Sequence, residues 1–269
     1  MRLQLLSALF LAAVAVSGAG AGQLTEEQIN ERLKDAEPLP LHVTSAELIT
    51  PTGRYGHRVL GAEGEYAALR VGLRERYCPK CSSTGLQSEV VIELPEDRVF
   101  EDVETRLADL NGDGFAEIIV VESSAGGGAE LAVYGVVDDA VGKIAATPPI
   151  GRRNRWLAPA GIADFNGDGQ NDIAYVEKPH IGGDLYLWTM RDGQLVEFAR
   201  KGGFSNHKIG EDFITGDVRD CGDGPEAVLP NFNWSKLMAV RFDGAGWDVR
   251  PIADETDAAT VDAALACGN

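Results

Sequence analysis

The chain of 269 residues carries 42 acidic and 24 basic side chains, which gives a formal net charge of −18 at pH 7. This charge makes nucleic acid and anionic membrane surfaces poor partners, and it favours divalent cations and basic proteins. The length is sufficient for one large domain or two small ones with a hydrophobic core.

The first 21 residues have the organisation of a secretory signal peptide. Arg2 supplies a positive charge, residues 5–16 form an apolar run, and small residues follow, with Ala19 and Ala21 in an A-x-A pattern. A membrane anchor is the alternative, but this run is shorter than the ~20 apolar residues that span a bilayer. We predict cleavage after Ala21, a mature chain without an integral membrane segment, and a periplasmic or secreted location.

Residues 22–40 are expected to form a short helix and a linker. Thr25 can cap the helix, with Gln28 as the reciprocal partner of a capping box. Pro38 and Pro40 end the helical pattern. This segment is too short to be a domain of its own.

From residue 41 to residue 269 the pattern changes to short β-rich runs separated by glycine-rich and Asp-Gly turns, which predicts an all-β fold. The runs cover residues 66–73, 89–94, 117–122, 130–134, 172–176, 184–188 and 236–241.

An acidic turn recurs along this β-rich part. Residues 108–120 match residues 163–175, with Asp109 and Asp164 separated by 164 − 109 = 55 positions. A degenerate third copy begins at Asp217, 217 − 164 = 53 positions later. Together with an abbreviated first copy that lacks the acidic turn, the chain contains about four units. A period of ~50 residues with about four strands per unit is typical of a β-propeller.

The D-x-N-x-D-G-x-x-D/E turns, each at the start of a β-rich unit, resemble FG-GAP/VCBS repeats, which occur in integrin α-subunit propellers and in many bacterial exported proteins. The resemblance extends over roughly residues 47–252 and is specific in the first two turns. It implies a small β-propeller over residues 41–269. At this spacing the chain has room for about four or five blades, so the seven blades of integrins do not transfer.

The two matching turns have the residue types and spacing of calcium sites. Calcium takes six to eight oxygen ligands, and carboxylates and amides at alternate positions of a tight loop can converge on one ion. The alternative is that Asp and Asn close the turns through local hydrogen bonds without a metal. The expected ligands are Asp109, Asn111, Asp113, the Phe115 carbonyl and Glu117 in one turn, and Asp164, Asn166, Asp168, the Gln170 carbonyl and Asp172 in the other.

The third copy is predicted to bind calcium weakly or not at all. Counted from Asp217, its acids have the wrong spacing, and Arg219 falls at a ligand position. Cys221 lies in this turn, so a disulfide is expected to hold it in place of a metal. An even number of cysteines in an exported chain favours disulfides, and we favour the pairs Cys78–Cys81 and Cys221–Cys267.

A basic residue precedes each acidic turn, and a similar one occurs in the first unit. These side chains either line one face as an anion site or, as we favour, pair with acids such as Glu101, Asp102, Glu211 and Asp212. The basic residues are Arg58, Arg98, Arg155 and Lys208.

The sequence contains none of the common catalytic motifs that we sought, namely G-x-S-x-G, H-E-x-x-H and the P-loop. We therefore expect a non-catalytic module that binds a protein or glycan. A polysaccharide hydrolase or lyase and a structural envelope protein are the alternatives. Aromatic anchors for a partner, or equally core residues, are Tyr55, Trp156, Trp188, Trp234 and Trp247.

Overall fold

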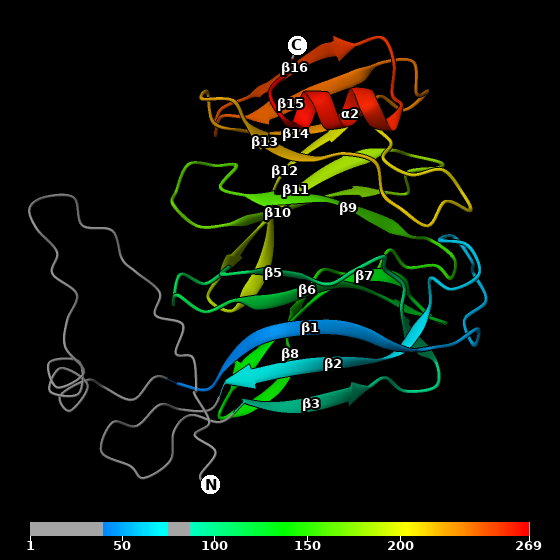
Figure 1. Cartoon of the computed structure of the whole chain (residues 1–269), viewed down its shortest axis with the longest axis vertical. Coiled ribbons are helices and arrows are strands. Elements are labelled where there is room, and N and C mark those ends of the chain that lie inside the picture. Colours follow the sequence, from blue (N-terminus) through cyan, green and yellow to red (C-terminus); the bar gives the residue numbers. More distant parts are fainter. Residues whose placement is uncertain (1–39, 75–86, 269) are drawn as a thin grey trace, which may run out of the picture.

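The computed structural model describes residues 40–74 and 87–268 (Figure 1). The predicted signal peptide, the N-terminal helix and the Cys78–Cys81 pair lie outside these residues. The described part is built from antiparallel strands and one short helix, which confirms the all-β prediction. Within the described ranges, no helix is long and apolar enough to cross a membrane.

The strands form four consecutive units. The first unit contains β1 (His42–Pro51), β2 (Tyr66–Arg74) and β3 (Gln87–Glu93), and the second contains β4 (Arg98–Phe100), β5 (Arg106–Ala108), β6 (Glu117–Ser124), β7 (Gly128–Val137) and β8 (Ala140–Ala146). The third contains β9 (Leu157–Ala163), β10 (Asp172–Glu177), β11 (Asp184–Arg191) and β12 (Gln194–Gly202). The fourth contains β13 (Asp217–Asp220), β14 (Pro225–Pro230), β15 (Leu237–Phe242), β16 (Trp247–Ala253) and helix α2 (Ala258–Leu265).

The third and fourth units are each a four-stranded sheet in chain order. The first two units share one eight-stranded sheet, because β4 pairs with β2 at a single position, Tyr66 with Phe100, and also pairs with β6. The short strands β4 and β5 both lie along the same strand, β6, and together they correspond to the single first strand of the third unit, β9.

The units pack face to face, and the alternation of side chains explains why the interior strands are continuously apolar. On β6, Ile118 and Val120 pack toward the first unit, whereas Ile119 and Val121 pack toward the third. Strands β10 and β11 divide their side chains between the second and fourth units in the same way. A strand buried on both faces needs apolar residues at every position, and this accounts for the unbroken run Ile118–Val121.

The two ends of the stack are closed differently. On the first unit, β2 turns Leu69, Val71 and Leu73 toward the second unit, and its opposite face carries Arg70, which pairs with Glu47 at 2.7 Å. On the fourth unit, α2 covers the face that points away from the third unit, where its apolar side chains pack against strands β14 and β15. The residues of this contact are Val228, Leu237, Val261 and Ala264.

Figure 1 shows the four units one above another in chain order, from β1–β3 to α2. Among the described residues, the larger contacts between strands of different units join the first to the second, the second to the third and the third to the fourth. None of these contacts joins the first unit to the fourth.

Candidate metal sites in the acidic turns

Each acidic turn joins the first strand of a unit to the next strand. The second-unit turn (residues 109–117) connects β5 to β6, and the third-unit turn (residues 164–172) connects β9 to β10. The strand registers are equivalent, because Ala108 pairs with Glu117 where Ala163 pairs with Asp172. The two turns therefore occupy the same place in two successive units.

Hydrogen bonds from backbone N–H groups shape the second-unit turn. The Asp109 carboxylate accepts from Gly112 at 2.7 Å and from Gly114 at 2.8 Å. Asn111 Oδ1 accepts from the N–H of Asp113 at 2.8 Å, and Asp113 Oδ1 accepts from the N–H of Phe115 at 2.8 Å. Gly112 and Gly114 have φ of 76° and 86°, a left-handed conformation that favours glycine.

The third-unit turn repeats this pattern residue by residue. Asp164 accepts from Gly167 at 2.7 Å and from Gly169 at 2.8 Å. The side chain of Asn166 accepts from the N–H of Asp168 at 2.8 Å, and Asp168 accepts from the residue two positions further on at 2.9 Å. These contacts are the local hydrogen bonds that both interpretations of the turns require, so the bonds alone do not separate a metal site from a metal-free turn.

The last acid of each turn is buried without a basic partner among the described residues. Glu117 is 5% exposed and accepts from the Leu110 N–H at 2.8 Å. Asp172 is fully buried and accepts from the Phe165 N–H at 3.0 Å. Burial, with a smaller contribution from the neighbouring Asp113, raises the pKa of Glu117 to about 7, and burial raises the pKa of Asp172 to about 6.

The donor set of each turn fits a hard cation in chemical type. Carboxylate, side-chain amide and backbone carbonyl oxygens are the ligands that calcium prefers. Within the described ranges, no three His, Cys, Asp or Glu side chains form a cluster that could hold a metal ion. A calcium ion in the second-unit turn would therefore also depend on Asn111 and on the Phe115 carbonyl, and in the third-unit turn on Asn166 and the Gln170 carbonyl. Coordination by these ten residues stays a prediction.

The structure corrects the alignment of the third copy. Arg219 pairs across the strands with Glu226, in the place where Ala108 pairs with Glu117. Asp220, and not Asp217, therefore corresponds to the first acid of the other turns. Its carboxylate accepts from Gly222 at 2.8 Å and from a second glycine at 3.1 Å. The fourth-unit turn (residues 220–226) is two residues shorter, since 226 − 220 = 6 and 117 − 109 = 8.

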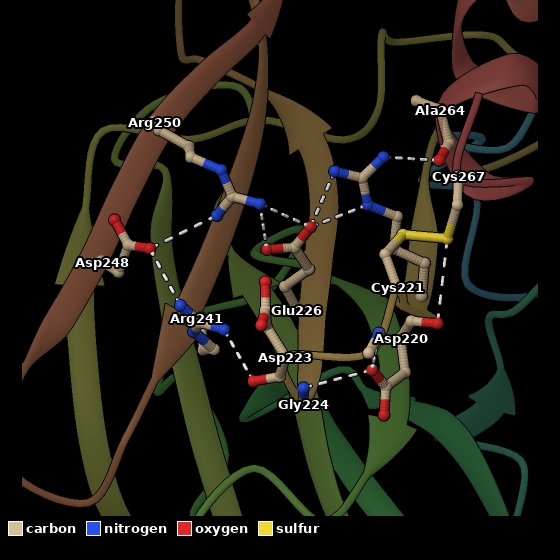
Figure 2. A network of polar contacts seen from close by, with 12 residues as sticks. Asp220, Cys221, Asp223, Gly224, Glu226, Arg241, Asp248, Arg250, Ala264 and Cys267 are labelled. Atoms are coloured by element: carbon tan, nitrogen blue, oxygen red, sulfur yellow. Dashed lines mark hydrogen bonds and ion pairs between the residues drawn. A yellow bond between two sulfur atoms is a disulfide. The ribbon is translucent and has the colours of Figure 1, made fainter. Parts of the chain in front are cut away.

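Two arginines neutralise the buried acid of the fourth-unit turn (Figure 2). Glu226 is 3% exposed, and its carboxylate lies 2.7 Å from Arg219 Nη2 and 2.7 Å from Arg250 Nη2. Arg219 also donates to the carbonyl of Ala264 in α2 at 2.6 Å. Arg219 occupies the strand position that is alanine in the second and third units. The change from alanine to arginine at this position therefore gives the fourth unit a cation that the other two units lack.

The disulfide between Cys221 and Cys267 is present, as predicted. Cys221 occupies the second position of the fourth-unit turn, where the other turns have the buried Leu110 and Phe165. The bond fixes the residues that follow α2 against the turn (Figure 2). A covalent link therefore stands where the other units have an apolar contact.

The recurring basic residues do not form one ring. Arg98 pairs with Glu122 and with Glu130, the latter at 2.8 Å, so the ion-pair interpretation holds for Arg98, although its partners differ from the predicted ones. Lys208 does not occupy the position of Arg98. Phe204 bridges to Asn231 where Phe100 pairs with Glu122, so Phe204 corresponds to Phe100. Arg98 precedes Phe100 in the chain, whereas Lys208 follows Phe204.

The predicted partner acids have other roles. Glu101 lies 2.7 Å from His57 Nδ1, and Asp102 pairs with Arg106 at 3.0 Å. His180 Nε2 lies 3.0 Å from His207 Nδ1, and burial lowers the pKa of His180 to about 4. These histidines are thus part of the packing between units.

Three of the five candidate anchor aromatics are core residues: Tyr55, Trp156 and Trp188 are each at most 7% exposed. Trp234 and Trp247 are half-buried.

The sequence interpretation missed Arg250 and the role of Asp220. Arg250 lies 24 residues from Glu226 on another strand, and no local pattern joins the two. Asp220 could have been found from the spacing, because the run D-C-G-D-G at residues 220–224 retains the acid and both glycines of the turn.

Antiparallel β-units with an acidic turn between the first two strands of the unit define the chain as an all-β repeat protein. A family model described as FG-GAP-like repeat matches residues 109–175, from the first residue of the second-unit turn to strand β10. The chain is an FG-GAP repeat-containing protein. No curated protein matches the chain.

Proposed function

We propose that this chain is an exported, calcium-stabilised interaction module that binds a partner protein and catalyses no reaction. FG-GAP-like repeats suggest a protein-interaction module, and this supports a protein partner in preference to a glycan. The signal-peptide pattern of residues 1–21 and the Cys221–Cys267 disulfide support export, because disulfides persist in oxidising compartments.

One observation carries the calcium part of the proposal. Three equivalent turns each bury a carboxylate. Among these three, only the carboxylate of the fourth-unit turn lies next to arginines, which come from strands β13 and β16. A buried ion without a counter-charge is unfavourable, so the protein either protonates the group or pairs it with a cation. In the second- and third-unit turns, the neighbouring acids and amide oxygens supply ligands that attract a divalent cation. We infer that calcium has the role there that Arg219 and Arg250 have in the fourth unit.

We also propose that the four units are blades of the propeller type. Four antiparallel units that pack face to face, three of them with an acidic turn in the same place, support this interpretation. The helix α2 on the outer face of the fourth unit supports an arc with closed ends as the arrangement of these blades.

Thermal unfolding of the mature protein, with calcium and then with excess chelator, tests the proposal. Free calcium at about 100 times its Kd adds about 2.7 kcal/mol to the free energy of unfolding, which raises the midpoint by roughly 5–10 °C in a domain of this size. We expect this rise to disappear in the double variant Asp113→Ala, Asp168→Ala.

Asp243→Ala is the matched control. Asp243 also closes an exposed turn by accepting two backbone N–H groups, at 3.0 and 2.7 Å, but it belongs to none of the three acidic turns. This variant should keep the calcium-dependent rise. If the wild-type midpoint is the same in calcium and in chelator, the acidic turns are hydrogen-bonded turns only and the calcium proposal fails.

A further inference from the structure

A continuous groove runs along the side of the stack, from the first unit to α2. Its first part lies between the loop at residues 60–66 and Asp102, and it shares Val103 and Asp212 with the middle part. The middle part passes the start of β5 and the middle of β9, and it shares Phe213 and Asp217 with the last part. A hydrogen bond from the Gly210 N–H to the Val59 carbonyl, at 2.9 Å, holds the first-unit loop against the segment that lines the groove.

The last part of the groove combines apolar and charged side chains. It has a volume of about 450 Å³ and lies between α2, which contributes Val261 and Leu265, and the segment before β13. Phe213 lines it and remains 52% exposed, unusually open for a phenylalanine. Trp234 lines the same part in a left-handed backbone conformation (φ 60°), and Lys208 Nζ lies 4.1 Å from the centre of its ring. This part can therefore receive one bulky apolar side chain.

The groove is strongly acidic. Its two basic side chains are both engaged, Arg106 with Asp102 and Lys208 with the ring of Trp234. Seven carboxylates that line it make no ion pair with any described residue, and the charge of the whole chain has the same sign. These are Glu63, Glu104, Glu211, Asp212, Asp217, Asp257 and Asp262.

We propose that this groove binds an extended basic peptide segment of the partner protein, with one large apolar side chain held between Phe213, Trp234 and Leu265. The inference rests on the proposed function as an interaction module and specifies the class of partner. Two features carry it: an elongated groove that crosses several units, and charge complementarity between its unpaired carboxylates and lysine or arginine side chains. An apolar pocket inside a charged rim is the usual anatomy of a protein interface.

The test uses the calcium-loaded mature protein and a fluorescein-labelled peptide of about ten residues with alternating lysine and leucine, measured by fluorescence anisotropy. The peptide should bind, and its affinity should fall as salt is added. The double variant Asp212→Asn, Asp217→Asn should weaken binding about tenfold or more, which corresponds to about 1.4 kcal/mol. Phe213→Ala should weaken binding by a similar factor.

Matched controls separate the groove from the general charge of the protein. Asp192→Asn, Asp243→Asn removes two exposed acids outside the groove, and Phe232→Ala removes an exposed phenylalanine outside it. Both should bind the peptide as the wild type does. Equal weakening by the two aspartate pairs, or no effect of Phe213→Ala, would show non-specific attraction and overturn the proposal. Absence of binding would also overturn it, while the calcium-dependent unfolding midpoint, which is measured separately, would still report on the proposed function.

Discussion

The second-unit and fourth-unit turns face the same physical problem with different solutions. Both place a carboxylate at the start of an interior strand, where the packing of the next layer removes it from water. In the fourth unit, a guanidinium from the opposing strand position and a second one from β16 reach the acid. In the second unit the opposing position is Ala108, which cannot do so, and the turn instead has two more residues and additional side-chain oxygens. Under the calcium proposal, the fourth unit therefore carries its own cation, whereas the second unit takes one from solution.

The largest expected effect comes from removing the cation that the fourth unit carries. Arg219→Ala leaves Glu226 buried with only the more exposed Arg250, and it also removes the hydrogen bond to Ala264. Breaking a buried pair from one side costs about 3–5 kcal/mol. We therefore expect a loss of about 3 kcal/mol in chemical denaturation, of the same size with calcium and with chelator.

Arg241→Ala is the control for this variant, because its carboxylate partner Asp248 is half exposed. An exposed pair contributes less than about 1 kcal/mol. If Arg219→Ala costs no more than Arg241→Ala, the guanidinium is not the counter-charge that Glu226 requires.

A somewhat smaller effect is expected from the disulfide. The bond closes a loop with a sequence separation of 46 residues, and loops of this length contribute about 2–4 kcal/mol. The double variant Cys221→Ser, Cys267→Ser should lose about this amount in equilibrium denaturation. Its calcium-dependent rise in midpoint should equal that of the wild type, because the bond lies in the unit that carries its own cations. A rise that vanished with the disulfide would mean that the turns are not independent.

The smallest effect is the most discriminating one. Glu117→Gln removes a buried negative charge that has no protein cation, so in excess chelator it should raise the free energy of unfolding by about 1 kcal/mol. In calcium it should lower the free energy of unfolding, because a ligand is lost. Glu226→Gln should destabilise the protein in both conditions, since it leaves two guanidinium groups facing each other. If both variants change the free energy of unfolding in the same direction in chelator, the buried acids of the two turns do not differ in their counter-charge.

The sequence predicted much of this arrangement because its strongest signals are local. The alternation of glycine and acid at residues 109–117 and 164–172 located both turns, and the run at residues 117–122 was correctly predicted to be a strand. The pairing of Cys221 with Cys267 was also predicted correctly.

Other features depend on contacts between distant segments, and the sequence interpretation did not reach them. The turn that begins at Asp220 was placed three residues too early, although residues 220–224 retain the acid and both glycines, and the register of β13 with β14 corrects the placement. The pairing of Arg250 with Glu226 arises where β16 returns beside β15, and sequence spacing does not encode that geometry. The groove is likewise assembled from loops of several units.

The closed ends of the stack have a consequence for the number of repeats. An interior unit offers an apolar face on each side, so a further copy inserted between the second and third units would meet partners on both. The fourth unit ends this growth: α2, locked by its disulfide, covers the surface on which another copy would otherwise settle. An additional repeat could therefore be accommodated inside the array, where it would contact apolar faces on both sides, but not on the face that α2 covers.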